Sequence, residues 1–384
     1  MPPFRRVASL ASPGDLVALA FAPNVGPVAA DVVADASRNS TREMRSRTTR
    51  RARPTPSLRS HAHFPSVVVA ILVCGVAALG CGGVGGEAGS SGGPATSGGS
   101  SAGQPLDSSA FAPGACVAFA PTTGDRHETV FLDAGHGGID PGGVGTTESG
   151  KTIYEADETL PVELDAMALL RAEGFRVVVS RTRSTTVVRL RSGDESGGIL
   201  TLRGSHDDVV ARDVCANDAG ARALVGIYFD AGPSAQNAGS LTAYDAARPF
   251  SAANLTLATL VQRDVLDQMN AQGWGIPNDG VLPDTTLGSF VGDPSSGGIA
   301  GEAAAYDHLL LLGPAAAGYF ATPSRMPGAV IEPLYLTDPF EGSIASTTHG
   351  QMVIARGIAS ALEQFLTPTH DGTGQRAKSS GPTG

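Results

Sequence analysis

The sequence lacks the features that are typical of membrane-spanning and of nucleic-acid-binding proteins. None of its 384 residues belongs to an apolar run of 18 or more, so a helix that spans a bilayer is not expected. Tryptophan occurs once and cysteine four times. The first 60 residues hold ten arginines, whereas the remaining residues hold 17 basic and 33 acidic side chains. Nucleic-acid binding needs a basic surface, so this acidic balance excludes nucleic acid as an expected partner.

The N-terminal region has the pattern of an export signal. Arginines precede residues 67–79, a stretch of thirteen apolar or small residues, and Gly80 and Cys81 follow it. A basic segment, an apolar segment of that length and a small residue before a cleavage point are typical of a secretory signal. The run ending at Cys81 also resembles a bacterial lipobox. We therefore expect a leader over residues 1–80 and a lipid anchor at Cys81, with a plain secretory signal as the alternative.

Composition divides the rest of the chain into a tether, a domain and a tail. Glycine, serine and alanine dominate much of residues 81–115, which predicts a flexible linker. Residues 367–384 are polar and are expected to form a loose tail. The intervening residues 116–366 are enough for one α/β domain. Of the four cysteines, Cys116 and Cys215 lie in this domain; export favours a disulfide between them, but the sequence leaves their separation open.

Apolar runs alternate with helical patterns along the domain. The sequence predicts strands at 129–133, 176–180, 223–229, 240–244, 308–312 and 329–335, and helices at 160–173, 206–219, 252–272 and 349–366. This alternation predicts an α/β fold: a single three-layer domain with a mainly parallel, twisted sheet and helices on both faces. Residues 273–305 are rich in glycine, proline, aspartate and serine, and are expected to form a loop that shapes the substrate site.

Three chemically active residues stand near the ends of predicted strands. His136 follows the first strand among glycines, which permit a tight turn and expose the imidazole. Glu155 is expected on a loop, because Pro161 should delay the start of the helix to about Thr159. Glu332 lies in a buried strand, where a carboxylate needs a partner or a function. One histidine and two carboxylates suit a catalytic metal with a general base; an anion-binding turn or a solvated acid are the less specific alternatives.

The motif around His136 resembles that of one enzyme family. The run LDAGHGGIDPG at residues 132–142 is similar to the opening motif of the zinc-dependent N-acetylmuramoyl-L-alanine amidases, which hydrolyse bacterial peptidoglycan. A following glutamate, Glu155, and a helix-ending glycine, Gly174, fall at the family's separations. The run PGAVIE at residues 327–332 resembles its C-terminal motif. The resemblance implies that His136 and Glu155 bind zinc and that Glu332 is the general base.

One position departs from this family. Its members carry a third zinc-binding histidine at the end of a central strand, where this chain has Tyr228. Tyr228 could bind zinc as a phenolate, because a bound metal lowers the pKa of its ligands. Asp230, His206 or His308 could replace it as the ligand, and Asp230 is the best placed because it lies two residues away. The site could also be inactive, yet Glu332, which binds no metal in the family, is retained.

The sequence thus predicts an exported peptidoglycan hydrolase of the bacterial cell envelope. Zinc is the expected cofactor, with His136, Glu155 and Tyr228 as its ligands and Glu332 as the catalytic residue. The substrate bond joins N-acetylmuramic acid to L-alanine, and the protein is expected to act as a monomer that contacts a membrane only through Cys81. The alternatives are an inactive peptidoglycan-binding lipoprotein of the same fold and a metallopeptidase that acts on other amides.

Overall fold

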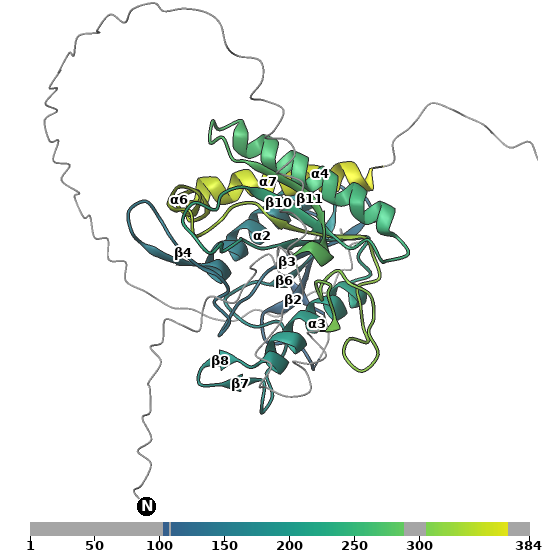
Figure 1. Cartoon of the computed structure of the whole chain (residues 1–384). Helices are drawn as coiled ribbons and strands as arrows, with labels where there is room; N and C mark the ends of the chain where they lie inside the picture. Colours follow the sequence, from purple (N-terminus) through teal and green to yellow (C-terminus); the bar gives the residue numbers. More distant parts are fainter. Residues whose placement is uncertain (1–102, 107–108, 288–304, 368–384) are drawn as a thin grey trace, which may run out of the picture. The chain divides into compact units, whose positions relative to one another are not determined.

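The computed structural model describes residues 103–106, 109–287 and 305–367, and these belong to one compact unit (Figure 1). The expected leader, the expected lipid anchor at Cys81 and nearly all of the expected tail lie outside these residues, so they remain predictions. No helix in the described ranges is long and apolar enough to cross a membrane.

The domain is built on an eight-stranded sheet in the order β1-β2-β6-β3-β9-β12-β10-β11. Its central strands β6, β3, β9 and β12 run parallel, whereas β2 and β10 run antiparallel to their inner neighbours. The strands are β1 (Gln104–Pro105), β2 (Ala115–Phe119), β3 (Thr129–Ala134), β6 (Arg176–Arg181), β9 (Ala223–Ile227), β10 (Ser240–Tyr244), β11 (Asn278–Pro283) and β12 (Gly328–Glu332). The mainly parallel sheet confirms the predicted fold class.

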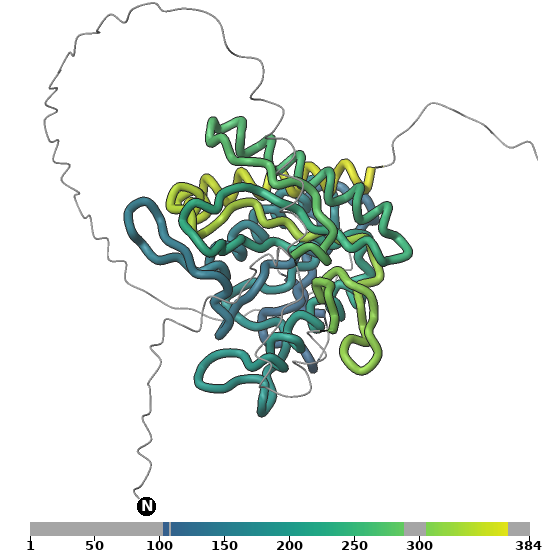
Figure 2. Tube along the Cα trace, viewed as in Figure 1, coloured from purple at the N-terminus to yellow at the C-terminus, as the bar shows by residue number. Residues whose placement is uncertain are grey.

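Helices cover both faces of this sheet. One face carries α2 (Glu155–Ala172), α4 (Ser251–Asn270) and α7 (Thr348–Leu366), with α7 packed against both of the others. The other face carries α3 (Leu202–Asp218), and the chain after residue 305 packs beside it (Figure 2). Short elements complete the domain: β4 (Val144–Thr146), β5 (Thr152–Tyr154), β7 (Glu195–Ser196), β8 (Ile199–Leu200), η2 (Asp284–Thr286) and α6 (Pro339–Ala345).

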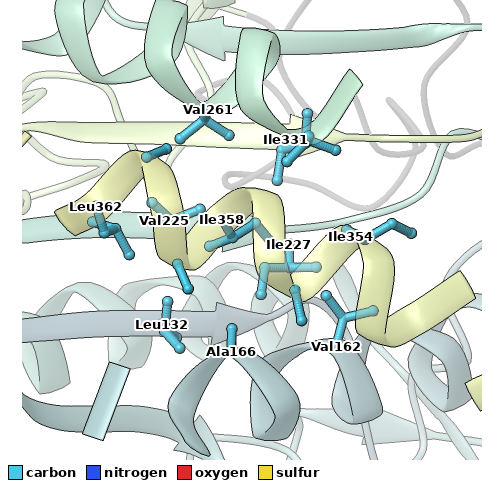
Figure 3. Close-up of a cluster of buried hydrophobic side chains, with 14 of the residues drawn as sticks. Leu132, Val162, Ala166, Val225, Ile227, Val261, Ile331, Ile354, Ile358 and Leu362 are labelled. Atoms are coloured by element: carbon cyan, nitrogen blue, oxygen red, sulfur yellow. The ribbon is translucent and has the colours of Figure 1, made fainter. Parts of the chain in front are cut away.

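The larger core lies between the sheet and the α2–α4–α7 layer (Figure 3). Alternate residues of β3, β9 and β12, including Leu132, Val225 and Ile331, point toward this layer and are fully buried. From α7, Ile354 and Ile358 reach toward them. Each such side chain contributes roughly 1.5–3 kcal/mol through removal of apolar surface from water. This core fixes the sheet, and thereby the positions of the strand ends where the polar residues gather.

The second core lies on the α3 side and includes a disulfide. Cys116 in β2 and Cys215 in α3 are bonded, with their Cα atoms 5.7 Å apart. The bond links β2, the strand next to the edge strand β1, to helix α3 across a sequence separation of 99 residues. The pairing that the sequence left open is therefore present.

The domain begins earlier in the chain than the sequence predicted. Residues 81–115 were expected to be linker, but β1 pairs with β2, and Phe111 is buried in the second core with an exposed fraction of 3%. The glycine-rich composition that predicted a linker ends before these residues. The apolar Phe111 and the short pairing of β1 are therefore part of the fold, although they precede the predicted boundary at residue 116.

Two regions near the second edge of the sheet differ from the prediction. Residues 308–312 form a turn rather than a strand, in which the Leu312 amide donates to the Leu309 carbonyl at 3.0 Å. Their leucines fill the second core, and an apolar run alone does not distinguish a strand from a packed turn. The region 273–305, expected to be a loop that shapes the substrate site, contains β11, which pairs in parallel with β10. Its residues 288–304 lie outside the described residues, so the role of the loop stays a prediction.

Candidate active site

His136 lies directly beyond the end of β3, with a positive φ of 60°. Its Nδ1 atom is 2.8 Å from Asp140 Oδ2, and its Nε2 atom is 3.1 Å from Glu155 Oε2. The Nε2 atom is buried, and despite this short distance it has no hydrogen-bond partner. Burial by itself would lower the pKa of His136, but the carboxylates of Glu155 and Asp140 raise it well above its usual value.

Glu155 is the first residue of α2 and not part of a preceding loop. Its Oε2 atom accepts the Gly143 amide at 2.7 Å, and Oε1 accepts the Phe229 amide at 3.0 Å. These two bonds fix the carboxylate against His136. Pro161 lies inside the helix, contrary to the expected helix start. The carbonyl that its missing amide leaves free belongs to Asp157, which is exposed to water.

Two glycines of the motif are required by close packing. A Cβ atom on Gly142, where φ is 68°, would lie 2.6 Å from the His136 ring and 2.8 Å from Glu155 Cβ. A Cβ atom on Gly135 would lie 2.4 Å from the Tyr228 ring. Any larger side chain would push these residues apart, so the glycines allow the imidazole and the carboxylate to meet.

Tyr228 lies beside this pair but directs its hydroxyl elsewhere. Its ring meets the His136 ring edge to face, with centroids 5.5 Å apart. Its hydroxyl donates to Asp133 Oδ2 at 3.1 Å. Burial and the Asp133 carboxylate raise the pKa of Tyr228 well above its usual value. The phenol is therefore a hydrogen-bond donor to Asp133 in this arrangement.

Glu332 is the last residue of β12 and has an exposed fraction of only 2%. Its carboxyl group interacts directly with that of Asp230, which also contacts Tyr335. Burial, then Asp230 and Glu155, raise the pKa of Glu332 well above its usual value. The Oδ1 atom of Asp230 is buried and has no hydrogen-bond partner.

The other expected ligands lie away from this site. His206 in α3 approaches Asp207 and the Tyr319 carbonyl, each at 2.9 Å. His308 lies with Asp245 and Asp284, and these three are the one group of His, Cys, Asp or Glu in the described ranges with ligand atoms all within 4.8 Å. The His136–Glu155 pair thus has no third ligand atom of these types at that distance within the described residues.

Two buried arginines hold the loop that carries His136, and sequence reasoning did not identify this role. Arg212 in α3 donates to Asp133 Oδ1 at 2.5 Å, to Asp208 Oδ2 at 2.8 Å and to the His136 carbonyl at 2.9 Å. Arg181 donates to the Ala134 carbonyl at 3.2 Å. Arginines are mostly found on protein surfaces, so no local sequence pattern distinguished these two from solvated arginines. Their burial depends on the packing of the complete sheet.

An open cavity of about 340 Å³ adjoins the site. Val144 and Thr146 of β4 line one side, and Gly232 and Ser234 line the other. Gly143, the residue before this wall, donates its amide to Glu155. The cavity therefore gives an extended ligand a place next to the polar residues.

Comparisons with known proteins identify a family for this chain. Residues 130–364 match the family model Amidase_3, described as N-acetylmuramoyl-L-alanine amidase. The AmiC2 amidase of Nostoc punctiforme is 20% identical, with 63% of this chain and 99% of that chain covered and a TM-score of 0.42. The CwlD amidase of Clostridioides difficile, solved in complex with the GerS lipoprotein, is 20% identical, with 62% and 98% covered and a TM-score of 0.44.

A search of curated protein sequences found no match. The family match itself spans more than half of the chain and includes His136, Glu155, Tyr228 and Glu332. It confirms the resemblance that the motif around His136 indicated. The chain belongs to the N-acetylmuramoyl-L-alanine amidase family.

Proposed function

We propose that this protein hydrolyses the amide bond between N-acetylmuramic acid and L-alanine in peptidoglycan, with zinc as its cofactor. The observation that carries the proposal is the contact between His136 Nε2 and Glu155 Oε2, 3.1 Å apart and without a hydrogen bond from Nε2. Two buried atoms of types that bind metals, which lie this close without a hydrogen bond between them, could both be ligands of one cation. Family membership supports peptidoglycan as the substrate and a metal-dependent reaction.

Asp230 is the better candidate for the third ligand. Its Oδ1 atom is buried without a partner, and its carboxylate is a ligand type that zinc accepts. Tyr228 would have to break its bond to Asp133 and lose a proton that burial retains. Asp230 would have to turn from Glu332 toward the His136–Glu155 pair, since the three residues do not form a group of ligand atoms within 4.8 Å. One imidazole and two carboxylates fit zinc; when bound, zinc polarises the scissile carbonyl and lowers the pKa of water.

The chain's own groups then move the proton. Burial and the neighbouring Asp230 carboxylate raise the pKa of Glu332 in the present arrangement. When Asp230 turns to a cation, Glu332 loses its closest carboxylate neighbour and can act as the general base toward the attacking water. The same group can return the proton to the amino group of L-alanine as the amide breaks. His136 and Glu155 keep their positions because backbone amides and Asp140 hold them.

A cell-wall assay with three variants tests this proposal. Glu332→Gln should keep zinc and lose activity by roughly 100-fold or more, as expected when a general base is removed. Asp230→Asn should lose the zinc ion bound with His136 and Glu155, whereas Tyr228→Phe should keep both this zinc ion and activity. Activity is read as the clearing of purified cell walls and the release of peptides with a free L-alanine amino group. Loss of zinc in Tyr228→Phe but not in Asp230→Asn would return the ligand role to the phenol.

The second candidate function is a peptidoglycan-binding protein without activity. The tyrosine at the position of the family's third histidine favours it, because the phenol bonds Asp133 and not the His136–Glu155 pair. The Tyr228→His variant distinguishes the two candidates. Activity that appears only in the histidine variant, with cell-wall binding in both proteins, would identify the native chain as a binder.

A peptidoglycan substrate places the protein in the bacterial cell envelope. The lipid anchor at Cys81 and the monomeric state remain proposals. A Cys81→Ser variant expressed in a bacterium should leave the membrane fraction and keep its activity on isolated walls. Retention in the membrane fraction would argue against a lipid anchor at this cysteine. The molar mass of the purified protein tests the monomer.

A further inference from the structure

A second group of metal-type ligands lies in the domain, away from the His136–Glu155 pair. Asp245 follows β10, Asp284 opens η2 directly after β11, and His308 comes from the turn near Leu309. Each offers one ligand atom, and the three atoms lie within 4.8 Å of one another. Three segments that are distant in sequence therefore converge here.

The sheet topology separates this group from the active site. β10 runs antiparallel to β12, with Leu241 opposite Glu332 and Ala243 opposite Val330. Asp245 lies four residues beyond Leu241, which corresponds to about 13 Å along the strand. Glu332 and His136 stand at the carboxyl ends of β12 and β3, whereas Asp245 stands near the start of β12. The two groups therefore lie at opposite ends of the β-strands.

Two of the three candidate ligand atoms are buried and lack hydrogen bonds, whereas Asp284 Oδ2 accepts the Leu309 amide at 3.0 Å. Asp245 has an exposed fraction of 0%, and its Oδ2 atom has no hydrogen-bond partner. It lies 2.8 Å from His308 Nδ1, which also has no hydrogen-bond partner. Asp284 Oδ2 is 3.3 Å from the same nitrogen, and ligand atoms around a tetrahedral zinc ion are about 3.3 Å apart.

Hydrogen bonds from backbone amides orient the two carboxylates, and no arginine or lysine forms an ion pair with them in the described residues. Asp245 Oδ1 accepts the amides of Ala247 and Arg248, and Asp284 Oδ1 accepts the Thr285 amide. The Arg248 guanidinium gives its hydrogen bonds to backbone carbonyls, including that of Gly313 at 2.7 Å, rather than to these carboxylates.

We propose that Asp245, Asp284 and His308 bind a second divalent transition-metal ion, Zn²⁺ or Mn²⁺, which joins β10, β11 and the turn at His308. An imidazole with carboxylates suits these ions, whereas Ca²⁺ and Mg²⁺ favour sites made entirely of oxygen atoms. The backbone bonds to both carboxylates supply the outer contacts that orient metal ligands. This site needs no catalytic role, and it stands independently of the proposed amidase reaction.

Metal stoichiometry of the full-length protein tests the site. The protein is stripped with a chelator and equilibrated with Zn²⁺, Mn²⁺ or Ca²⁺ in separate samples, and the bound metal is measured by atomic emission. We expect two Zn²⁺ per chain in the wild type and one in Asp245→Asn or His308→Ala. The control His127→Ala removes a histidine that also lies beside an aspartate but is 86% exposed, and it should keep two.

The His136→Ala variant separates this site from the active site. It should retain one Zn²⁺, and adding Asp245→Asn should remove it. A wild-type stoichiometry unchanged by Asp245→Asn and His308→Ala would overturn the second site. If these variants do not fold, the His136→Ala protein still decides the matter: Zn²⁺ should raise its melting temperature, and no rise, or a rise with Ca²⁺ alone, would refute the proposal.

Discussion

Replacement of Arg212 by methionine should destabilise the domain by about 3 kcal/mol. Arg212 has an exposed fraction of 1% and pairs with Asp133 and Asp208, which are both buried. Removal of one partner from a buried ion pair costs about 3–5 kcal/mol, because a charge stays buried without compensation. We expect the lower end of this range. Asp133 keeps the Tyr228 hydroxyl, and Asp208 keeps backbone amides as donors.

Urea unfolding followed by circular dichroism measures this loss, with the disulfide intact in all proteins. Arg222→Met is the matched control: Arg222 also pairs with a carboxylate, that of Glu128 at 3.4 Å, but its side chain is 67% exposed. An exposed pair contributes about 0–1 kcal/mol, so the control should unfold near the wild-type midpoint. A loss below about 1 kcal/mol in Arg212→Met would refute the idea that Arg212 compensates these buried acids.

Three further predictions follow from single features. Burial raises the pKa of Glu158 from 4.5 to about 7. Because the folded state holds the proton more tightly than the unfolded chain, the free energy of unfolding is highest below pH 4.5 and decreases as the pH rises from 4.5 to 7. The loss amounts to roughly 3 kcal/mol, and Glu158→Gln should remove it from unfolding curves between pH 5 and 8. Reduction of Cys116–Cys215, which closes a long loop, should lower stability by about 4 kcal/mol in calorimetry, and a shift under 1 kcal/mol would contradict the loop-entropy account. Gly142→Ala should weaken zinc binding by roughly tenfold or more, because its Cβ would meet the His136 ring; unchanged affinity in a zinc titration would show that the loop can relax.

Local patterns predicted the central part of the fold well. The runs at 129–133, 176–180 and 240–244 are strands within one residue of their predicted bounds, since buried β-branched and apolar residues between turn signals leave few alternatives. The predicted strand at 308–312 is a turn, and the predicted loop at 273–305 contains β11 in its described part. Pairing of β11 depends on an edge that β10 provides, and the leucines near residue 309 pack into a core that only the complete sheet creates.

The sequence by itself determined the family, the alternation of strands and helices, and the pairing of His136 with Glu155. These properties depend on short motifs whose glycines and strand ends fix the local backbone. Only the tertiary structure decided that Tyr228 bonds Asp133, that Arg212 supports the His136 loop, and that Asp245 meets His308. Those contacts join segments far apart in the chain, and their partners and burial are set by the order and direction of strands in the sheet.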